Sequence, residues 1–206
     1  AMEFGEFLKK YQQLPLLNSK IILTGESHPD SLRVQLARWA RAGHIIQLRR
    51  GIYVFAPHFQ KVRPSAYFIA SVLTSPSYVS LEKAMEFHGL IPEAVFSVTS
   101  VTTKRPGSFT TLLGRFDYSH IQPGLFWGYA SAVFEGQTGF MAHPEKALLD
   151  LFYLRPARVT AEYLDELRLQ NLEKVNPVRL LEYAHRFHKP GIRRAAETLN
   201  NYIQDV

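Results

Sequence analysis

Cysteine is absent from all 206 residues of the sequence. Disulfide bonds and thiolate metal sites are therefore excluded. A chain of this length can bury such a core. The absence of cysteine fits a reducing compartment, and we expect the protein to act in the cytoplasm.

Long apolar runs are missing as well. No stretch reaches the roughly 18 residues that a membrane-spanning helix needs, and the first residues lack the basic start and apolar centre of a secretion signal. We therefore expect no membrane partner. The sequence also has no glycine-rich phosphate loop and no nucleophile-elbow motif. We expect no catalytic activity, no cofactor and no metal site.

Acidic residues are missing from residues 37–56, ARWARAGHIIQLRRGIYVFA, although this stretch holds four arginines. The net charge of the chain is +6, and nearly all of the excess lies in residues 1–62, with nine Lys or Arg against four Asp or Glu. Residues 63–206 are close to neutral. A solvated basic face would explain this asymmetry, but it is also typical of a polyanion-binding module joined to a neutral domain.

The order of predicted elements in residues 1–60 is that of a winged helix-turn-helix. Apolar spacing predicts a helix over 2–13 and another from about 30 to 42, which stops at Gly43. Between them, 19–24 can form a short helix capped by Asn18 or Ser19, although its β-branched residues also suit a strand. Residues 44–55 are β-rich on both sides of Gly51, which predicts a hairpin.

Residues 57–64 are the predicted junction, and residues 63–206 the predicted second domain. Its expected elements are helices near 65–73 and 80–89, strands near 96–103 and in hairpins around 114 and 136, a helix from Pro144, and three last helices near 160–170, 177–188 and 190–203. Because the strands are grouped and do not alternate with helices, the predicted fold class is α+β. The chain is thus expected to hold a winged helix followed by a mixed α+β domain that ends in several helices.

The helix over 30–42 has the pattern of a DNA-recognition helix. Its predicted core face holds Leu32, Leu36 and Trp39. The opposite side carries small and basic residues, namely Ser31, Val34, Ala37, Arg38 and Arg41, with Arg33 and Gln35 at the boundary. Arginine can bind guanine and glutamine can bind adenine, but arginine can equally bind phosphate. A solvated amphipathic helix remains the alternative interpretation.

The hairpin adds a second basic feature to this pattern. Gly51 relieves its turn, and Arg49 and Arg50 stand where the tip of a wing meets the phosphate backbone or the minor groove of DNA. Two independent basic features at the positions that a winged helix uses favour binding to double-stranded DNA.

Three stretches resemble the AbiEi-type family of antitoxins and transcriptional regulators from type IV toxin–antitoxin systems. LARWARAGHIIQLRRGIYV (36–54) resembles the end of the family's winged helix. SYVSLEKAMEFHGLIPEAVFSVTSVTT (77–103) resembles the start of its C-terminal domain, and HPEKALLDLFYL (143–154) resembles its most recognisable helix. The likeness covers roughly residues 3 to 155.

The resemblance implies a function. Family members repress their own operon through inverted repeats in the promoter, which leaves a homodimer on DNA as a candidate assembly. They also counter a nucleotidyltransferase-like toxin, in many cases without a stable complex; solitary relatives act as transcriptional regulators without a toxin. Carried over position by position, the DNA contacts fall on Ser31, Arg33, Gln35, Arg38, Arg41, Arg49 and Arg50.

A metal-dependent nuclease is the alternative that the residues leave open. Asp117 and Glu135 could hold a cation such as Mg²⁺, with Gln137 near them and with Glu145 and Lys146 behind. The alternative explanation is a solvated hairpin with scattered charges. His185 and His188 lie one helical turn apart, but the sequence offers no clear third ligand for a metal.

Overall fold

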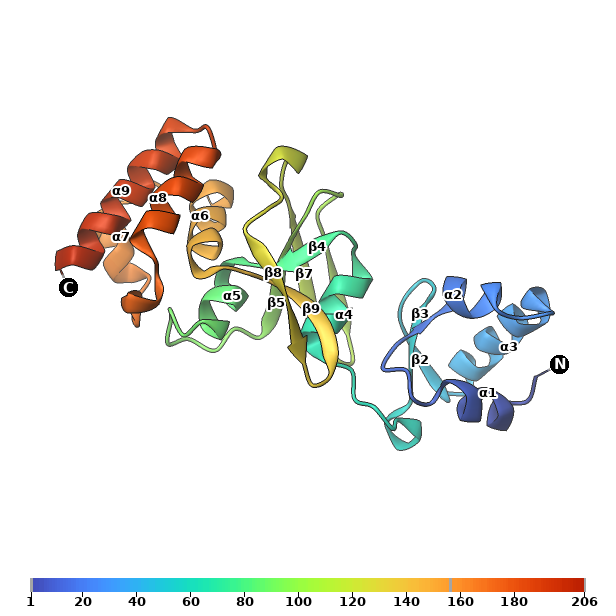
Figure 1. Ribbon diagram of the computed structural model, residues 1–206. Helices are drawn as coiled ribbons and strands as arrows, with labels where there is room; N and C mark the ends of the chain where they lie inside the picture. Colours follow the sequence, from blue (N-terminus) through green and yellow to red (C-terminus); the bar gives the residue numbers. More distant parts are fainter. Residues whose placement is uncertain (1, 156, 206) are drawn as a thin grey trace.

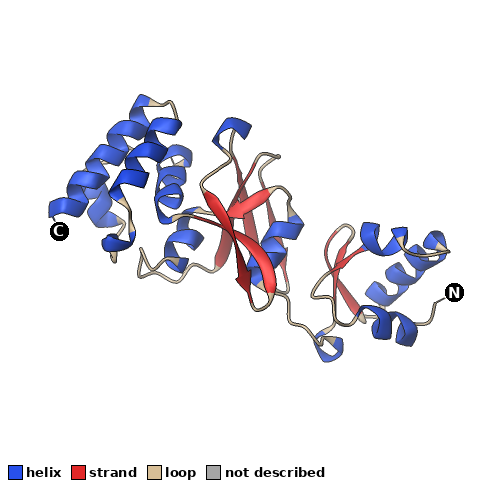
Figure 2. Ribbon diagram, viewed as in Figure 1, coloured by secondary structure: helices blue, strands red, loops and turns tan. Residues whose placement is uncertain are grey.

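The computed structural model describes residues 2–155 and 157–205. It is a mixed α+β structure, as the sequence predicts, with helices at both ends and a six-stranded sheet between them (Figure 1). Figure 2 shows strands only in the middle and N-terminal parts. None of the described helices is both long enough and apolar enough to cross a membrane.

The N-terminal part consists of three helices and a small antiparallel sheet with the strand order β1-β3-β2. Its elements are α1 (Phe4–Tyr11), β1 (Leu17–Asn18), α2 (Ser19–Thr24), α3 (Pro29–Arg41), β2 (Ile45–Arg49) and β3 (Ile52–Phe55). The ambiguous segment over 19–24 is a helix. The Asn18 side chain accepts a hydrogen bond from the backbone N–H of Lys20 at 3.1 Å, which caps that helix.

The first hydrophobic core forms where the three N-terminal helices meet the small sheet. Leu32, Leu36 and Trp39 of α3 are 3%, 3% and 7% exposed, so the predicted core face of this helix is confirmed. Phe7 of α1 packs against Trp39 with ring centroids 4.7 Å apart. The helix ends before Gly43, whose φ of +75° suits glycine and turns the chain into β2.

The second part of the chain is built on the six-stranded sheet, with the strand order β6-β7-β5-β4-β9-β8. Its elements up to the last strand are α4 (Ala66–Leu73), β4 (Ser77–Val79), α5 (Leu81–Phe87), β5 (Ser97–Thr102), β6 (Gly107–Thr111), β7 (Gly114–His120), β8 (Tyr129–Phe134) and β9 (Gln137–Ala142). The short strand β4 is not predicted from the sequence, yet it pairs with both β5 and β9 near the middle of the sheet.

The last helices form a bundle beside the sheet (Figure 1). They are α6 (Pro144–Leu154), α7 (Ala161–Glu166), α8 (Pro177–Arg186) and α9 (Pro190–Asp205), close to the predicted ranges. Side chains from the sheet and from these helices share one continuous core. The C-terminal helices are therefore part of the same packed unit as the sheet.

The two parts of the chain are joined by more than the link over 57–64, which Figure 1 shows as an extended segment with one short turn. Leu48, Ile52 and Val54, from the N-terminal hairpin, belong to the large core and not to the small one. One side of the β2–β3 hairpin therefore packs toward the second part. Because apolar burial stabilises such contacts, the hairpin is held in place.

Candidate nucleic-acid interface and the adjoining groove

The outward face of α3 carries the residues that the sequence predicts for DNA binding. Arg33, Arg38 and Arg41 are exposed, whereas Ser31 and Gln35 are half-buried at the edge of the helix–core contact. The buried leucines and Trp39 fix the rotation of the helix, so the arginines cannot turn inward without exposing the core. The helix therefore presents a basic surface on a rigid support.

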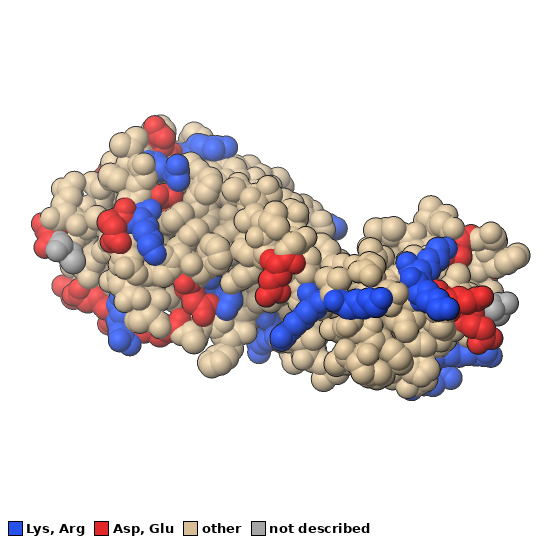
Figure 3. Space-filling view, turned by 60° about the horizontal axis from the view of Figure 1, so that its bottom comes forward, with Lys and Arg blue, Asp and Glu red and all other residues tan. Residues whose placement is uncertain are grey.

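The charges on this face are largely uncompensated. Among the described residues, neither Arg38 nor Arg41 has a carboxylate within 4.0 Å. Arg33 lies 3.2 Å from Asp30, but both side chains are mostly in water, so this contact is weak. Figure 3 shows Lys and Arg side chains gathered over the N-terminal part and its junction with the rest of the chain. Such a surface attracts a polyanion.

The tip of the β2–β3 hairpin is folded against the start of α2. Gly51, with φ of +84°, accepts a hydrogen bond on its carbonyl from the backbone N–H of Ser19 at 2.8 Å. A Cβ at this glycine would lie 3.1 Å from the Ser19 hydroxyl. Arg50 is exposed beside it, with no carboxylate within 4.0 Å among the residues described.

Arg49 lies in a different place from the one predicted. Its guanidinium donates a hydrogen bond to the backbone carbonyl of Leu73 in α4 and lies 5.1 Å from the centre of the Phe109 ring in β6. Although the residue as a whole is exposed, its charged end is turned toward the six-stranded sheet. In this arrangement Arg49 joins the two parts of the chain, and its guanidinium is directed toward Leu73 and Phe109. The DNA contact predicted for Arg49 at the wing tip stays a prediction.

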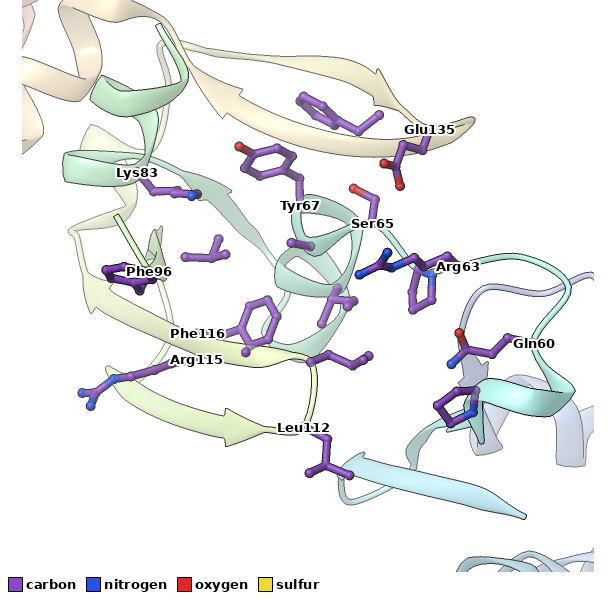
Figure 4. A pocket seen from close by; sticks show the side chains of 18 residues that line it. Gln60, Arg63, Ser65, Tyr67, Lys83, Phe96, Leu112, Arg115, Phe116 and Glu135 are labelled. Carbon is purple, nitrogen blue, oxygen red and sulfur yellow. The ribbon is translucent and has the colours of Figure 1, made fainter. Parts of the chain in front are cut away.

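A groove of about 950 Å³ lies at the same junction (Figure 4). Its floor is mostly apolar and includes Phe116, while Phe96 and Leu112 stand at its rim with 95% and 81% of their surface exposed. Arg63 and Lys83 reach into it from opposite sides in Figure 4. Large apolar hollows with a few polar groups are typical of binding sites.

The polar groups of the groove are mostly engaged within the chain. Lys83 lies 2.6 Å from a Glu86 carboxylate oxygen and donates to the Val95 carbonyl at 2.8 Å. Burial, assisted by the charge of Glu86, raises the pKa of the Tyr67 hydroxyl, which stays neutral and able to donate a hydrogen bond. The surface that the groove presents to a ligand is therefore mainly apolar, because most of its charged groups already have partners within the chain.

A buried polar network in the second part is not predicted from the sequence, from which only a helix beginning at Pro144 is expected in this region. Lys146 and Asp150 form an ion pair one turn apart on α6, and both side chains are 0% exposed. The Asp150 carboxylate also accepts hydrogen bonds from the hydroxyls of Tyr78 at 2.9 Å and Ser80 at 2.8 Å. The network thereby fixes α6 against the centre of the sheet.

Burial perturbs both ends of this ion pair. Desolvation lowers the pKa of the Lys146 ammonium and raises the pKa of the Asp150 carboxyl, and each charge counteracts the shift of the other. The ammonium also lies 4.8 Å from the centre of the Trp127 ring and 5.0 Å from that of Phe187. No opening leads to these groups, since all their side-chain atoms are enclosed. The network is suited to holding the fold together.

The residues of the alternative nuclease interpretation are spread over the second part. Asp117 lies on β7, where its carboxylate is 3.0 Å from Arg115, and Glu135 lies in the turn between β8 and β9. Three strands separate β7 from β8, which corresponds to roughly 19 Å at the usual strand spacing. Glu145 and Lys146 are fully buried. The structure therefore does not bring this set together.

Clusters of three or more His, Asp or Glu that could hold a metal ion are absent from residues 2–155 and 157–205. The rings of His185 and His188 lie near each other, with centroids 6.3 Å apart, and both residues are exposed at the end of α8. The pair therefore stands without a third ligand in the described part of the chain.

Comparison with known proteins gives no match: no family model fits the chain, and no curated protein matches its sequence.

Proposed function

We propose that residues 1–60 are a winged helix-turn-helix that binds double-stranded DNA, with α3 as the recognition helix. The order of three helices and a β2–β3 hairpin, with β1 pairing to β3, supports this assignment. The observation that carries it is the outward face of α3, above a buried Leu32–Leu36–Trp39 face. There Arg38 and Arg41 are exposed, and no carboxylate of residues 2–155 and 157–205 lies within 4.0 Å of them. Such a helix can enter the major groove with its basic side chains toward the bases.

The DNA contacts divide into two kinds. Arg38 and Arg41, with Gln35 at the edge, are placed to reach bases or phosphates from α3. Arg50 flanks them from the hairpin and contacts phosphate. Ser31 and Arg33 lie in the first turns of the helix, where side chains and backbone N–H groups commonly bind phosphate. Arg49 is left out of this interface because its charge is directed to Leu73 and Phe109.

The biological role we propose is that of a transcriptional regulator that represses its own operon and acts as the antitoxin of a type IV toxin–antitoxin system. This role rests on the resemblance of residues 36–54, 77–103 and 143–154 to the AbiEi-type family. The second part of the chain would counter the nucleotidyltransferase-like toxin. A solitary regulator without a toxin would use the same DNA-binding surface.

DNA binding is tested by fluorescence anisotropy with a duplex from upstream of the protein's own gene and with a shuffled duplex of equal length. Arg38→Ala combined with Arg41→Ala should weaken binding at least about tenfold. It should also make the log–log salt dependence shallower by roughly 0.9 for each phosphate that the variant no longer neutralises. Arg193→Ala with Arg194→Ala, at two exposed arginines of α9, is the matched control.

Two results would contradict the proposal. One is a parent protein that binds neither duplex at low salt. The other is equal binding by the α3 variant and the α9 control.

The antitoxin role needs its own experiment, namely co-expression with the product of the adjacent downstream gene. If that product arrests growth and this protein restores growth, the antitoxin proposal holds. Arrest without rescue would contradict it and leave the DNA-binding regulator.

A further inference from the structure

Strand β8 forms one edge of the six-stranded sheet and has none of the features that usually protect an edge. Its residues, YASAVF, include no charged side chain and no proline, and it pairs regularly with β9 along its whole length. Val133 is 72% exposed. Natural sheets usually block such edges with lysine, proline, a bulge or a covering element, because free strand edges pair with other chains.

The hydrogen-bonding pattern shows which backbone groups of β8 are free. The two-residue turn at Glu135 and Gly136 has positive φ at both positions, so Phe134 and Gln137 form a hydrogen-bonded pair. From there, hydrogen-bonded and non-hydrogen-bonded residue pairs alternate along β8 and β9. The hydrogen bond from His143 N–H to the Gly128 carbonyl, at 2.9 Å, agrees with this alternation. The N–H and C=O groups of Tyr129, Ser131 and Val133 therefore point away from β9. None of the hydrogen bonds found among the described residues involves them.

The opposite edge of the same sheet is covered. Strand β6 lies next to β2 of the N-terminal part, and the Arg49 guanidinium lies over the Phe109 ring. Among the described elements, by contrast, only β9 lies in extensive contact with β8. Figure 2 shows the β8–β9 hairpin at the front of the sheet. The β6 edge is thus covered by the chain itself, whereas the β8 edge is open.

We infer that β8 pairs with β8 of a second copy of this chain, antiparallel about a two-fold axis at Ser131, so that the two sheets become one. In this register Ser131 faces its own counterpart, and Tyr129 of each copy faces Val133 of the other. All six free groups of each strand edge are then paired in a ladder of six hydrogen bonds. Ala130 and Ala132, next to the axis, are small enough not to obstruct the approach.

Two further features fit a second copy better than an unrelated strand. The exposed Val133 would lie directly opposite Tyr129 of the other copy, an aromatic–aliphatic cross-strand pair, with the Tyr129 ring held in place by stacking on Tyr78 of its own chain at a centroid distance of 4.6 Å. Antiparallel pairing also brings the end of β8 next to Glu135 toward the opposite end of β8 in the other copy, where the Arg186 guanidinium lies 4.0 Å from the centre of the Trp127 ring. Neither Glu135 nor Arg186 has an oppositely charged partner within 4.0 Å among the described residues. The two ends of the β8 edge therefore carry opposite charges, and antiparallel pairing brings unlike ends to the same side of the dimer.

The first test measures the mass of the full-length protein in solution by sedimentation equilibrium between about 1 and 100 μM. The parent should be a dimer at the upper concentrations. Val133→Lys places a charge at the edge and should weaken dimerisation at least tenfold. Val178→Lys makes the same change at an exposed valine of α8, 64% exposed, and should leave the dimer intact. A monomeric parent, or a Val133→Lys variant that dimerises like the parent, would overturn the inference.

A second test does not depend on the stability of the lysine variant. The chain has no cysteine, so Ser131→Cys introduces a single thiol. Opposed residues of a hydrogen-bonded antiparallel pair have Cα atoms about 5.5 Å apart, within the range of a disulfide. Under mild oxidation this variant should form a covalent dimer much faster than Val178→Cys. Equal rates of cross-linking for the two variants would contradict the pairing.

The dimer does not rest on the proposed DNA-binding function, since both tests are made without DNA. If the edge pairs but no duplex binds, only the proposed function fails. If α3 binds DNA while the protein stays monomeric, only the dimer fails.

Discussion

The ion pair between Lys146 and Asp150 permits a quantitative test of what holds α6 to the sheet. In the parent, the Asp150 carboxylate accepts hydrogen bonds from Lys146, Tyr78 and Ser80, so both charges are compensated although neither side chain is exposed. Lys146→Met would leave the carboxylate buried with only two hydroxyl donors. Losing one partner of a buried ion pair costs about 3–5 kcal/mol.

The size of this effect suits urea denaturation followed by circular dichroism. With a dependence on urea of about 2 kcal/mol per molar, a loss of 3–5 kcal/mol lowers the midpoint by roughly 1.5–2.5 M. Asp150→Asn should cost a similar amount, because it leaves the ammonium without its counter-charge. The double variant keeps an amide oxygen for the Tyr78 and Ser80 hydroxyls and has no buried charge. We expect it to lose less stability than either single variant.

The comparison with an exposed ion pair provides the control. Asp30→Ala removes the partner of Arg33, but the two side chains are 93% and 69% exposed, so the midpoint should hardly change. The reasoning would be refuted if the losses of the two α6 variants simply added in the double variant. Additive losses would mean that Lys146 and Asp150 contribute independently and not as a pair.

Three other changes have definite expected results. Gly128→Ala should lower the melting temperature, because φ is +79° and the new Cβ would lie 2.9 Å from the Cγ of Lys146, which is held inside the core; a melting temperature equal to the parent's would show that the site relaxes. Burial lowers the pKa of His88 from its usual 6.5, so the folded state binds fewer protons at this residue than the unfolded state does. The stabilisation that neutral His88 contributes is therefore present above about pH 6.5 and is lost as the pH falls. The drop in urea midpoint from pH 7.5 to 5.5 should therefore be smaller in His88→Gln, and an unchanged drop would exclude this histidine as its source. Arg49→Ala should leave the salt dependence of DNA binding unchanged but speed proteolysis within residues 57–64, whereas a shallower salt dependence would return Arg49 to the DNA interface.

Local patterns predicted the elements of this protein well where one face of an element is apolar. The period of Leu32, Leu36 and Trp39 in α3 is unambiguous, and burial of all three follows from it. The segment over 19–24 was ambiguous because its isoleucines favour a strand. The cap from Asn18 and the burial of Ile22 in the small core decide for a helix.

Contacts between distant parts of the chain could not be predicted in this way. Lys146 and Asp150 have the spacing of an ordinary surface pair on a helix, and the apolar residues around them do not show that the charged positions themselves are buried. Their polar partner Tyr78 lies 68 residues before Lys146. It belongs to β4, a strand of three residues that is too short to give a periodic signal. An enclosed charge pair is therefore visible only once the sheet is assembled.

The arginines of residues 37–56 show how far charge alone can locate an interface. Their density predicts a basic surface. Charge alone, however, does not predict which of the arginine side chains point toward that surface. Arg38, Arg41 and Arg50 are exposed and have no carboxylate partner in the described part of the chain, whereas the Arg49 guanidinium contacts a carbonyl and an aromatic ring of the second part. Arg49 is the last residue of β2 and Arg50 lies in the turn that follows, so a difference of one residue separates a contact with the second part of the chain from an exposed cation. The same contact covers the β6 edge of the sheet, which leaves β8 as the edge available to a second copy.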